Sequence, residues 1–183
     1  MLLRGGQDYR IVPNLEIVGW DRLTYSLRDM TFTSTPGSLK RFRRTPWKFQ
    51  QTFLTPLKDL ERFVSIIISA HPPPEKACVT IDQVVFAPKT LKAFLSQHSI
   101  SEEVGHDISL EAVGQQEIEE LLRSTLADWI DFVFIPTPKP FVIYADHDEY
   151  TTFYANTQGN LNRIVDALSE KRFEKVEDYE RNL

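Results

Sequence analysis

The residues best suited to chemistry lie in one short segment, where cationic side chains alternate with aromatic ones. No Asp or Glu occurs between Met30 and Leu57, so no nearby carboxylate in the sequence neutralises this charge. Binders of single-stranded nucleic acid use this combination, because cations bind phosphates and rings stack on bases. The candidate binding residues are Lys40, Arg41, Arg43, Arg44, Trp47 and Lys48, with Phe42 and Phe49 between them.

Segment 40–49 is open to three interpretations. It could bind single-stranded nucleic acid or another anion, or it could dock on an acidic protein or a second subunit. In the third interpretation its rings pack into the core while its charges stay in water. The net charge of −5 counts against nucleic acid, because dedicated binders are usually basic. Residues 1–50 nevertheless carry nine Lys and Arg against four Asp and Glu, which indicates one cationic face.

A second candidate is the run Asp146-His147-Asp148-Glu149, which offers carboxylates and an imidazole to a divalent cation. Successive residues of a strand face opposite ways, so these side chains converge only in a special turn. Aspartate also favours turns for local hydrogen-bonding reasons. We therefore expect a solvated turn, no metal site and no cofactor.

Two further features have structural explanations. The acidic stretch 101–120 holds seven carboxylates and no Lys or Arg, which is typical of helix N-termini and exposed helix faces. The single cysteine, Cys78, lies in an apolar run, so we expect a buried, unreactive thiol. One cysteine also excludes an intramolecular disulfide and every Cys-rich zinc site.

The sequence lacks the motifs that identify common enzyme classes. It contains no GxGxxG, no GxxxxGK[ST], no HExxH and no GxSxG, and its four His residues lie far apart. We therefore expect a non-enzymatic protein-interaction or regulatory domain. The alternatives are an anion or single-stranded nucleic-acid binder that uses segment 40–49, and an enzyme whose site is assembled from scattered acidic and His residues.

The elements that must position these residues follow from hydrophobic periodicity. Alternation predicts a bulge near Asp29 and a hairpin around residues 146–149, whereas 34–55 and 99–114 look irregular. The predicted strands are 14–20, 23–33, 77–87, 132–135, 141–145, 150–155 and, weakly, 173–177. The predicted helices run from Thr55 to before Pro72, from Pro88 through Leu95, over 115–129, and from Thr157 through Leu168.

Together these elements predict an α+β fold, with a largely antiparallel sheet and two to four helices packed mainly on one face. The length of 183 residues suits one domain over 1–183, whose polar tail frays from about 178. We find no signal peptide and no apolar run of membrane-spanning length, which favours a cytoplasmic protein. We expect a monomer or weak dimer with an acidic protein as its partner, nucleic acid being the less favoured alternative.

Overall fold

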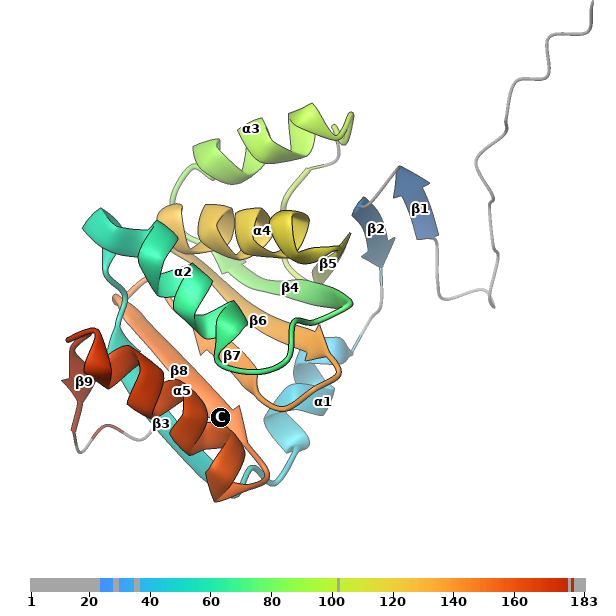
Figure 1. The fold of residues 1–183 in the computed structure, drawn as a ribbon. Coiled ribbons are helices and arrows are strands. Elements are labelled where there is room, and N and C mark those ends of the chain that lie inside the picture. The colour runs from blue at the N-terminus through green and yellow to red at the C-terminus, as the bar shows by residue number, and fades with distance from the viewer. Residues whose placement is uncertain (1–23, 28–29, 35–36, 102, 178, 180–183) are drawn as a thin grey trace, which may run out of the picture.

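The computed structural model describes residues 24–27, 30–34, 37–101, 103–177 and 179. Their centre is a nine-stranded sheet of order β1-β2-β5-β4-β6-β7-β8-β3-β9, in which every adjacent pair is antiparallel (Figure 1). The strands are β1 Thr24–Leu27, β2 Met30–Ser34, β3 Phe49–Leu54, β4 Lys76–Val84, β5 Ile108–Val113, β6 Ile130–Thr137, β7 Val142–Ala145, β8 Tyr150–Ala155 and β9 Lys175–Val176.

Three helices cover one face of the sheet, and a fourth packs on their outer side. Figure 1 shows α2, α4 and α5 across the face toward the viewer, with α3 beside α4. The short helix α1 packs on the opposite face. The helices are α1 Ser38–Arg44, α2 Leu60–Ser69, α3 Lys89–Gln97, α4 Gln115–Ala127 and α5 Gln158–Glu170, and a 3-10 turn at Leu57–Asp59 precedes α2.

The two faces of the sheet have separate hydrophobic clusters, because neighbouring residues of a strand point to opposite sides. The main core lies under α2, α4 and α5 and includes Phe132, Phe134 and Phe153, which are fully buried. A smaller cluster lies under α1 and consists of Leu39, Phe42, Val133, Val142, Tyr144 and Tyr154. The predicted α+β class is therefore confirmed, with five α-helices among the described residues in place of two to four.

The apolar residues that repeat at helical spacing in the predicted helices lie in the main core, apart from two. Val165 of α5 is half-buried, and Leu57 is 43% exposed because it lies in the 3-10 turn that precedes α2. Thr55 does not cap that helix, since its hydroxyl bonds to the hydroxyl of Thr151 at 2.8 Å. Thr157 does cap α5, because its side chain accepts from the N–H of Asn160.

Helix α3 is capped from another element. In its first turn, the N–H groups of Thr90 and Leu91 donate to the two carboxylate oxygens of Asp128 at 3.1 and 2.7 Å. Asp128 is buried and follows α4, so one carboxylate satisfies helix N–H groups that would otherwise have no acceptor. This contact holds α3 against the end of α4.

Three predictions about individual segments were wrong. Residues 34–55 contain α1 and β3, and residues 99–114 contain β5. Segment 23–33 was expected to be one strand, but it contains two antiparallel strands, β1 and β2, in which Leu27 pairs with Met30. The polar residues of β5 lie on the second face of the sheet, and those of α1 point toward solvent. They interrupt the apolar spacing from which the elements were predicted, so neither element was recognised.

Some predictions fall outside the described residues. These are the strand at 14–20, the bulge at Asp29 and the tail beyond residue 179. No helix among the described residues is both long enough and apolar enough to cross a membrane.

Candidate interaction groove

Helix α1 separates the rings of the basic segment from its charges. Gly37 precedes the helix with a φ of 85°, a left-handed conformation that glycine adopts without strain, and its carbonyl accepts the first helical hydrogen bond, from Arg41. Leu39 and Phe42, three residues apart, face the sheet and are buried. The exposed residues of the helix are Lys40, Arg41, Arg43 and Arg44.

Trp47 completes an aromatic cluster on the sheet. Its ring centroid lies 5.8 Å from both Phe42 and Tyr154, and its indole N–H donates to the carbonyl of Phe42 at 3.3 Å. The ammonium of Lys139 lies 5.9 Å from the ring centroid. The ring is half-buried, so a large part of it packs against protein and is not available for stacking on a ligand.

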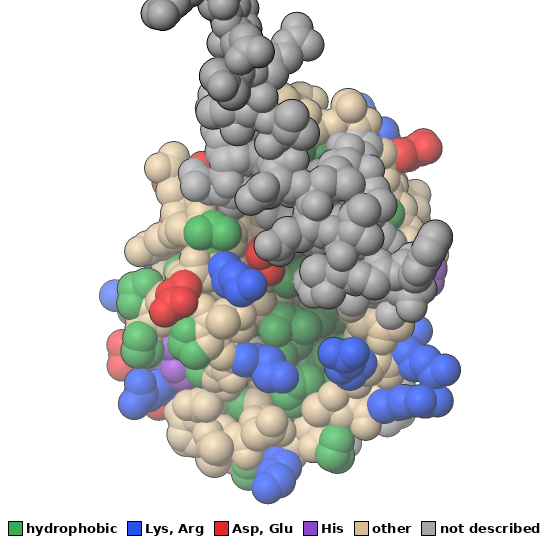
Figure 2. Space-filling view, turned by 90° about the vertical axis from the view of Figure 1, so that its right-hand side faces the viewer, with side chains coloured by type: hydrophobic (Ala, Val, Ile, Leu, Met, Phe, Trp, Pro, Cys, Tyr) green, Lys and Arg blue, Asp and Glu red, His purple; other side chains and the backbone are tan. Residues whose placement is uncertain are grey.

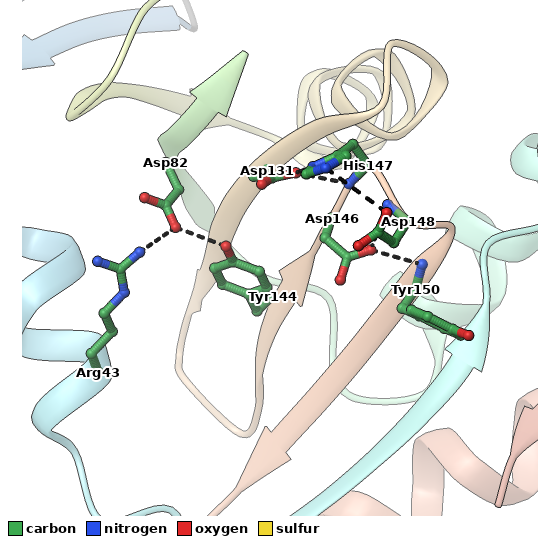
Figure 3. A network of polar contacts seen from close by, with 8 residues as sticks. All are labelled: Arg43, Asp82, Asp131, Tyr144, Asp146, His147, Asp148 and Tyr150. Atoms are coloured by element: carbon green, nitrogen blue, oxygen red, sulfur yellow. Dashed lines mark hydrogen bonds and ion pairs between the residues drawn. The ribbon is translucent and has the colours of Figure 1, made fainter. Parts of the chain in front are cut away.

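Arg43 differs from its neighbours because it anchors α1 to the sheet. The carboxylate of Asp82 accepts from the guanidinium of Arg43 at 2.5 Å and from the hydroxyl of Tyr144 at 2.7 Å, both on the same oxygen (Figure 3). The Asp82 side chain is only 10% exposed. Sequence reasoning missed Asp82, although a carboxylate after the apolar run of β4 was a signal for a buried polar contact.

A groove of about 710 Å³ follows the edge of the sheet where β3 begins. One wall comes from segment 45–51 and Tyr154, and the other from α5, through Gln158, Leu161, Asn162 and Val165. Among the residues that the structure describes, its charged lining residues are Arg43, Lys48 and Lys175, and none of its lining residues is Asp or Glu. Among these three, Arg43 pairs with Asp82 and Lys175 with Glu177, at 2.8 Å.

A second concavity, of about 440 Å³, adjoins the first along Thr45 and Pro46, which line both. Its charged lining residues are Lys40, Arg41 and Arg44, and no carboxylate of the described part of the chain lines it. Each of the six candidate residues therefore lines one hollow or the other. We call the two together the basic groove. Lys40, Arg41, Arg44 and Lys48 form no ion pair with any described residue.

The charge around α1 can be followed on the surface. Figure 2 looks onto the side of the molecule where α1 lies in Figure 1, and there Lys and Arg side chains surround an area of hydrophobic side chains. Cations that lack a carboxylate partner attract anions, and neighbouring cations add to the same field. The basic groove is therefore suited to an anionic ligand.

Two polar atoms at the groove are buried without a hydrogen-bond partner among the described residues. They are Oε1 of Gln50 and the hydroxyl of Tyr154. The two residues are direct neighbours across β3 and β8, so their side chains share one sheet face. Tyr154 is only 2% exposed, and burial raises the pKa of its hydroxyl, which therefore stays protonated as a donor.

The polar groups of the hairpin tip at residues 146–149 form hydrogen bonds with one another and with Asp131 of β6. Oδ1 of Asp146 accepts from the N–H groups of Asp148 and Tyr150, at 3.0 and 3.1 Å (Figure 3). Oδ1 of Asp131 accepts from the backbone N–H and ring Nδ1 of His147, at 2.7 and 2.8 Å. The two carboxylates thus satisfy the backbone N–H groups of the turn. The described residues hold no group of three or more side chains that could bind a metal ion.

The remaining candidates also make structural contacts. In the acidic stretch, Glu117 contacts His98 at 2.9 Å, and Asp107 accepts from the N–H of Gly37 at 3.2 Å. Cys78 was expected to be buried, but it is half-buried. It lies one residue out of phase with the buried Ala77 and Val79 of β4 and therefore points away from the main core.

Comparison with known proteins finds no match: no family model, no curated protein and no solved structure matches this chain.

Proposed function

We propose that this chain is a non-enzymatic protein-interaction domain that binds an acidic segment of a partner protein in the basic groove. The observation that carries the proposal is a charge imbalance. Lys40, Arg41, Arg44 and Lys48 have no ion-pair partner among the described residues, and no carboxylate lines either hollow. An acidic partner supplies the negative charge that these cations lack. The attraction between the two raises the affinity of the complex and the rate at which it forms. A cytoplasmic monomer or weak dimer belongs to the same proposal.

The aromatic residues favour a protein over single-stranded nucleic acid as the ligand. Non-specific binders of single strands present rings on which successive bases stack. Here Phe42 is buried, and Trp47 packs on Phe42 and Tyr154 and donates its N–H to a backbone carbonyl. The segment thus offers exposed cations but only partly exposed rings, at Trp47 and Phe49, which suits carboxylates better than stacked bases.

The test is a binding titration against two anionic probes, an oligoglutamate peptide and a single-stranded oligothymidylate, each at low and moderate salt. We expect oligoglutamate to bind and its affinity to fall with salt, because exposed charges are screened. The triple variant Lys40→Glu, Arg41→Glu, Arg44→Glu should weaken this binding by about tenfold or more, an effect of about 1.4 kcal/mol.

The matched control reverses three exposed lysines outside the basic groove, Lys58, Lys89 and Lys92. This control variant changes the net charge equally, so a site-specific effect leaves its affinity near that of the unaltered chain. Equal weakening in both variants would contradict the proposal. Tighter binding of oligothymidylate than of oligoglutamate would favour the nucleic-acid alternative instead, with a log-log salt slope of about −0.7 per phosphate contact.

A further inference from the structure

We infer that the acidic partner binds as an extended strand added to the open edge of β3, with one of its carboxylates hydrogen-bonded to the hydroxyl of Tyr154. This inference rests on the proposed function, because it states how the basic groove recognises its partner. Four independent features of the groove lead to it.

The first feature is that β3 has an incomplete neighbour on one side. Strand β8 pairs with all six residues of β3, whereas β9 pairs only with Thr52 and Phe53. Residues 49–51 therefore have a strand partner on one side only among the described residues. An edge of this kind is a template for an additional strand.

The second feature is the direction of the backbone groups at that edge. The N–H of Leu54 donates to the carbonyl of Glu174 on the β9 side, and the N–H of Thr55 donates to Glu149 on the β8 side. Because direction alternates along a strand, Gln50 points its N–H and carbonyl to the same side as Leu54. The side chain of Gln51 closes the end of β9 by donating to Val176, so Gln50 lies just beyond that end.

The third feature is that the groove has chemically different walls on the two faces of the sheet. On the α5 side, the buried Leu161 and the half-buried Val165 are apolar and lie beside the uncharged Gln158 and Asn162. On the other side lie Lys48 and Tyr154. The side chains of an added strand alternate between these walls. The two walls therefore favour a segment in which apolar and acidic residues alternate.

The fourth feature is the pair of unsatisfied atoms, Oε1 of Gln50 and the hydroxyl of Tyr154. A buried polar group without a partner costs stability, and a ligand that supplies the partner recovers that cost as affinity. The hydroxyl, held protonated by burial, donates to a carboxylate of the segment, while Oε1 accepts a donor from it. Both atoms are closed to water in the free protein, so the segment reaches them by displacing side chains of the groove wall.

The decisive variant is Tyr154→Phe, measured with a short capped peptide in which glutamate alternates with valine. The melting temperature should be unchanged or raised, because the deleted hydroxyl has no partner in the free protein. Peptide affinity should fall by about tenfold or more, the loss expected for a hydrogen bond to a charged group. The matched control is Tyr150→Phe, on the same strand but outside the groove lining, which should leave the affinity unchanged.

Strand addition is tested separately by methylating the backbone nitrogens of the peptide at alternate positions. Methylation of the N–H groups that face β3 should abolish binding, whereas methylation of the other set should be tolerated. A peptide of the same composition with its glutamates grouped should bind more weakly. Equal tolerance of both methylated sets would overturn the inference.

The remaining outcomes distinguish this inference from the proposed function. If oligoglutamate binds through the α1 cations but Tyr154→Phe and the methylated peptides show no effect, strand addition is wrong and the proposed function stands. If no acidic peptide binds, both fail. Tighter peptide binding after Glu180→Gln, which leaves the ion pair between Lys175 and Glu177 intact, would show that the chain's own C-terminal segment competes for the groove, and this would overturn its assignment to a partner. If oligothymidylate displaced the peptide, and did so only when Tyr154 is present, this result would also overturn the assignment of the groove to an acidic protein partner.

Discussion

Asp131 binds His147 twice through one oxygen: Oδ1 accepts from the backbone N–H at 2.7 Å and from ring Nδ1 at 2.8 Å. Asp131 is buried in β6, and His147 lies at the tip between β7 and β8. The hydrogen bond to the carboxylate raises the pKa of the His147 ring, against a smaller opposing effect of burial. This pair makes the stability of the hairpin depend on pH.

The first prediction concerns that dependence. A pKa raised on folding means that the stabilisation is complete below the unfolded value of about 6.5 and is lost as the pH rises through the folded value. Replacement of His147 by Ala should therefore cost more at pH 5.5 than at pH 8.5. The difference should be roughly 0.5 kcal/mol, since the ring is partly exposed and screened. Urea denaturation of both proteins at the two pH values measures it.

His71 provides a control of opposite sign. Its ring is buried, its Nε2 lies 3.0 Å from the carbonyl of Asn160, and burial lowers its pKa. A lowered pKa gives stability that is present above about pH 6.5 and is lost as the pH falls through the folded value. His71→Gln should thus cost less at pH 5.5 than at pH 8.5. The same pH trend for both variants would contradict this assignment.

The second prediction concerns the anchor of α1. Asp82→Ala should lower the free energy of unfolding by about 1–3 kcal/mol, because the Tyr144 hydroxyl and the Arg43 guanidinium both lose an acceptor. Arg44→Ala, on the same helix and without an ion pair among the described residues, should change it by less than about 0.5 kcal/mol. Chemical denaturation compares the two. An unaffected Asp82→Ala midpoint would show that α1 is held by packing alone.

The third prediction concerns Trp47. Its contacts with Phe42 and Tyr154 give it a packing role, so Trp47→Ala should cost about 3 kcal/mol, at the low end of the range for buried Trp because the ring is half-buried. Thermal melts measure this loss. We also expect no binding of oligothymidylate by the unaltered chain at low salt. A stable variant that loses oligonucleotide affinity would instead assign the ring to base stacking.

The fourth prediction compares two leucines of the predicted helix stripes. Leu121 of α4 is fully buried, so Leu121→Ala should cost about 2–5 kcal/mol. Leu57 is 43% exposed, so Leu57→Ala should cost less than about 0.5 kcal/mol. The denaturation midpoints of the two variants and of the unaltered chain, measured at one pH, give this comparison. Similar losses in both variants would contradict the position of the 3-10 turn.

The fifth prediction concerns metals at the hairpin tip. The carboxylate of Asp146 accepts turn N–H groups and that of Asp131 accepts from His147, so these groups are already engaged. Zinc or manganese should therefore leave the melting temperature unchanged. A stabilisation that disappears in His147→Ala would show that the tip binds metal.

The sequence by itself determined the elements whose residues repeat at a regular local spacing. The stripes of α4 and α5, the Thr157 cap and the hairpin around residues 146–149 depend on neighbours within a few positions, so their pattern is visible without the fold. The basic segment was visible for the same reason. Its helix was not, because only Leu39 and Phe42 of its seven residues are buried.

Only the tertiary structure decided which polar groups meet. Arg43 and Asp82 are 39 positions apart, and Asp131 and His147 are 16 apart. Gln50 and Tyr154 become neighbours because β3 pairs with β8, and the groove beside them lies where β3 extends past its pairing with β9. These contacts depend on strand order and register, which arise from the packing of the whole chain. Local periodicity carries no information about them, since it records which face a residue occupies but not which strand lies next to it.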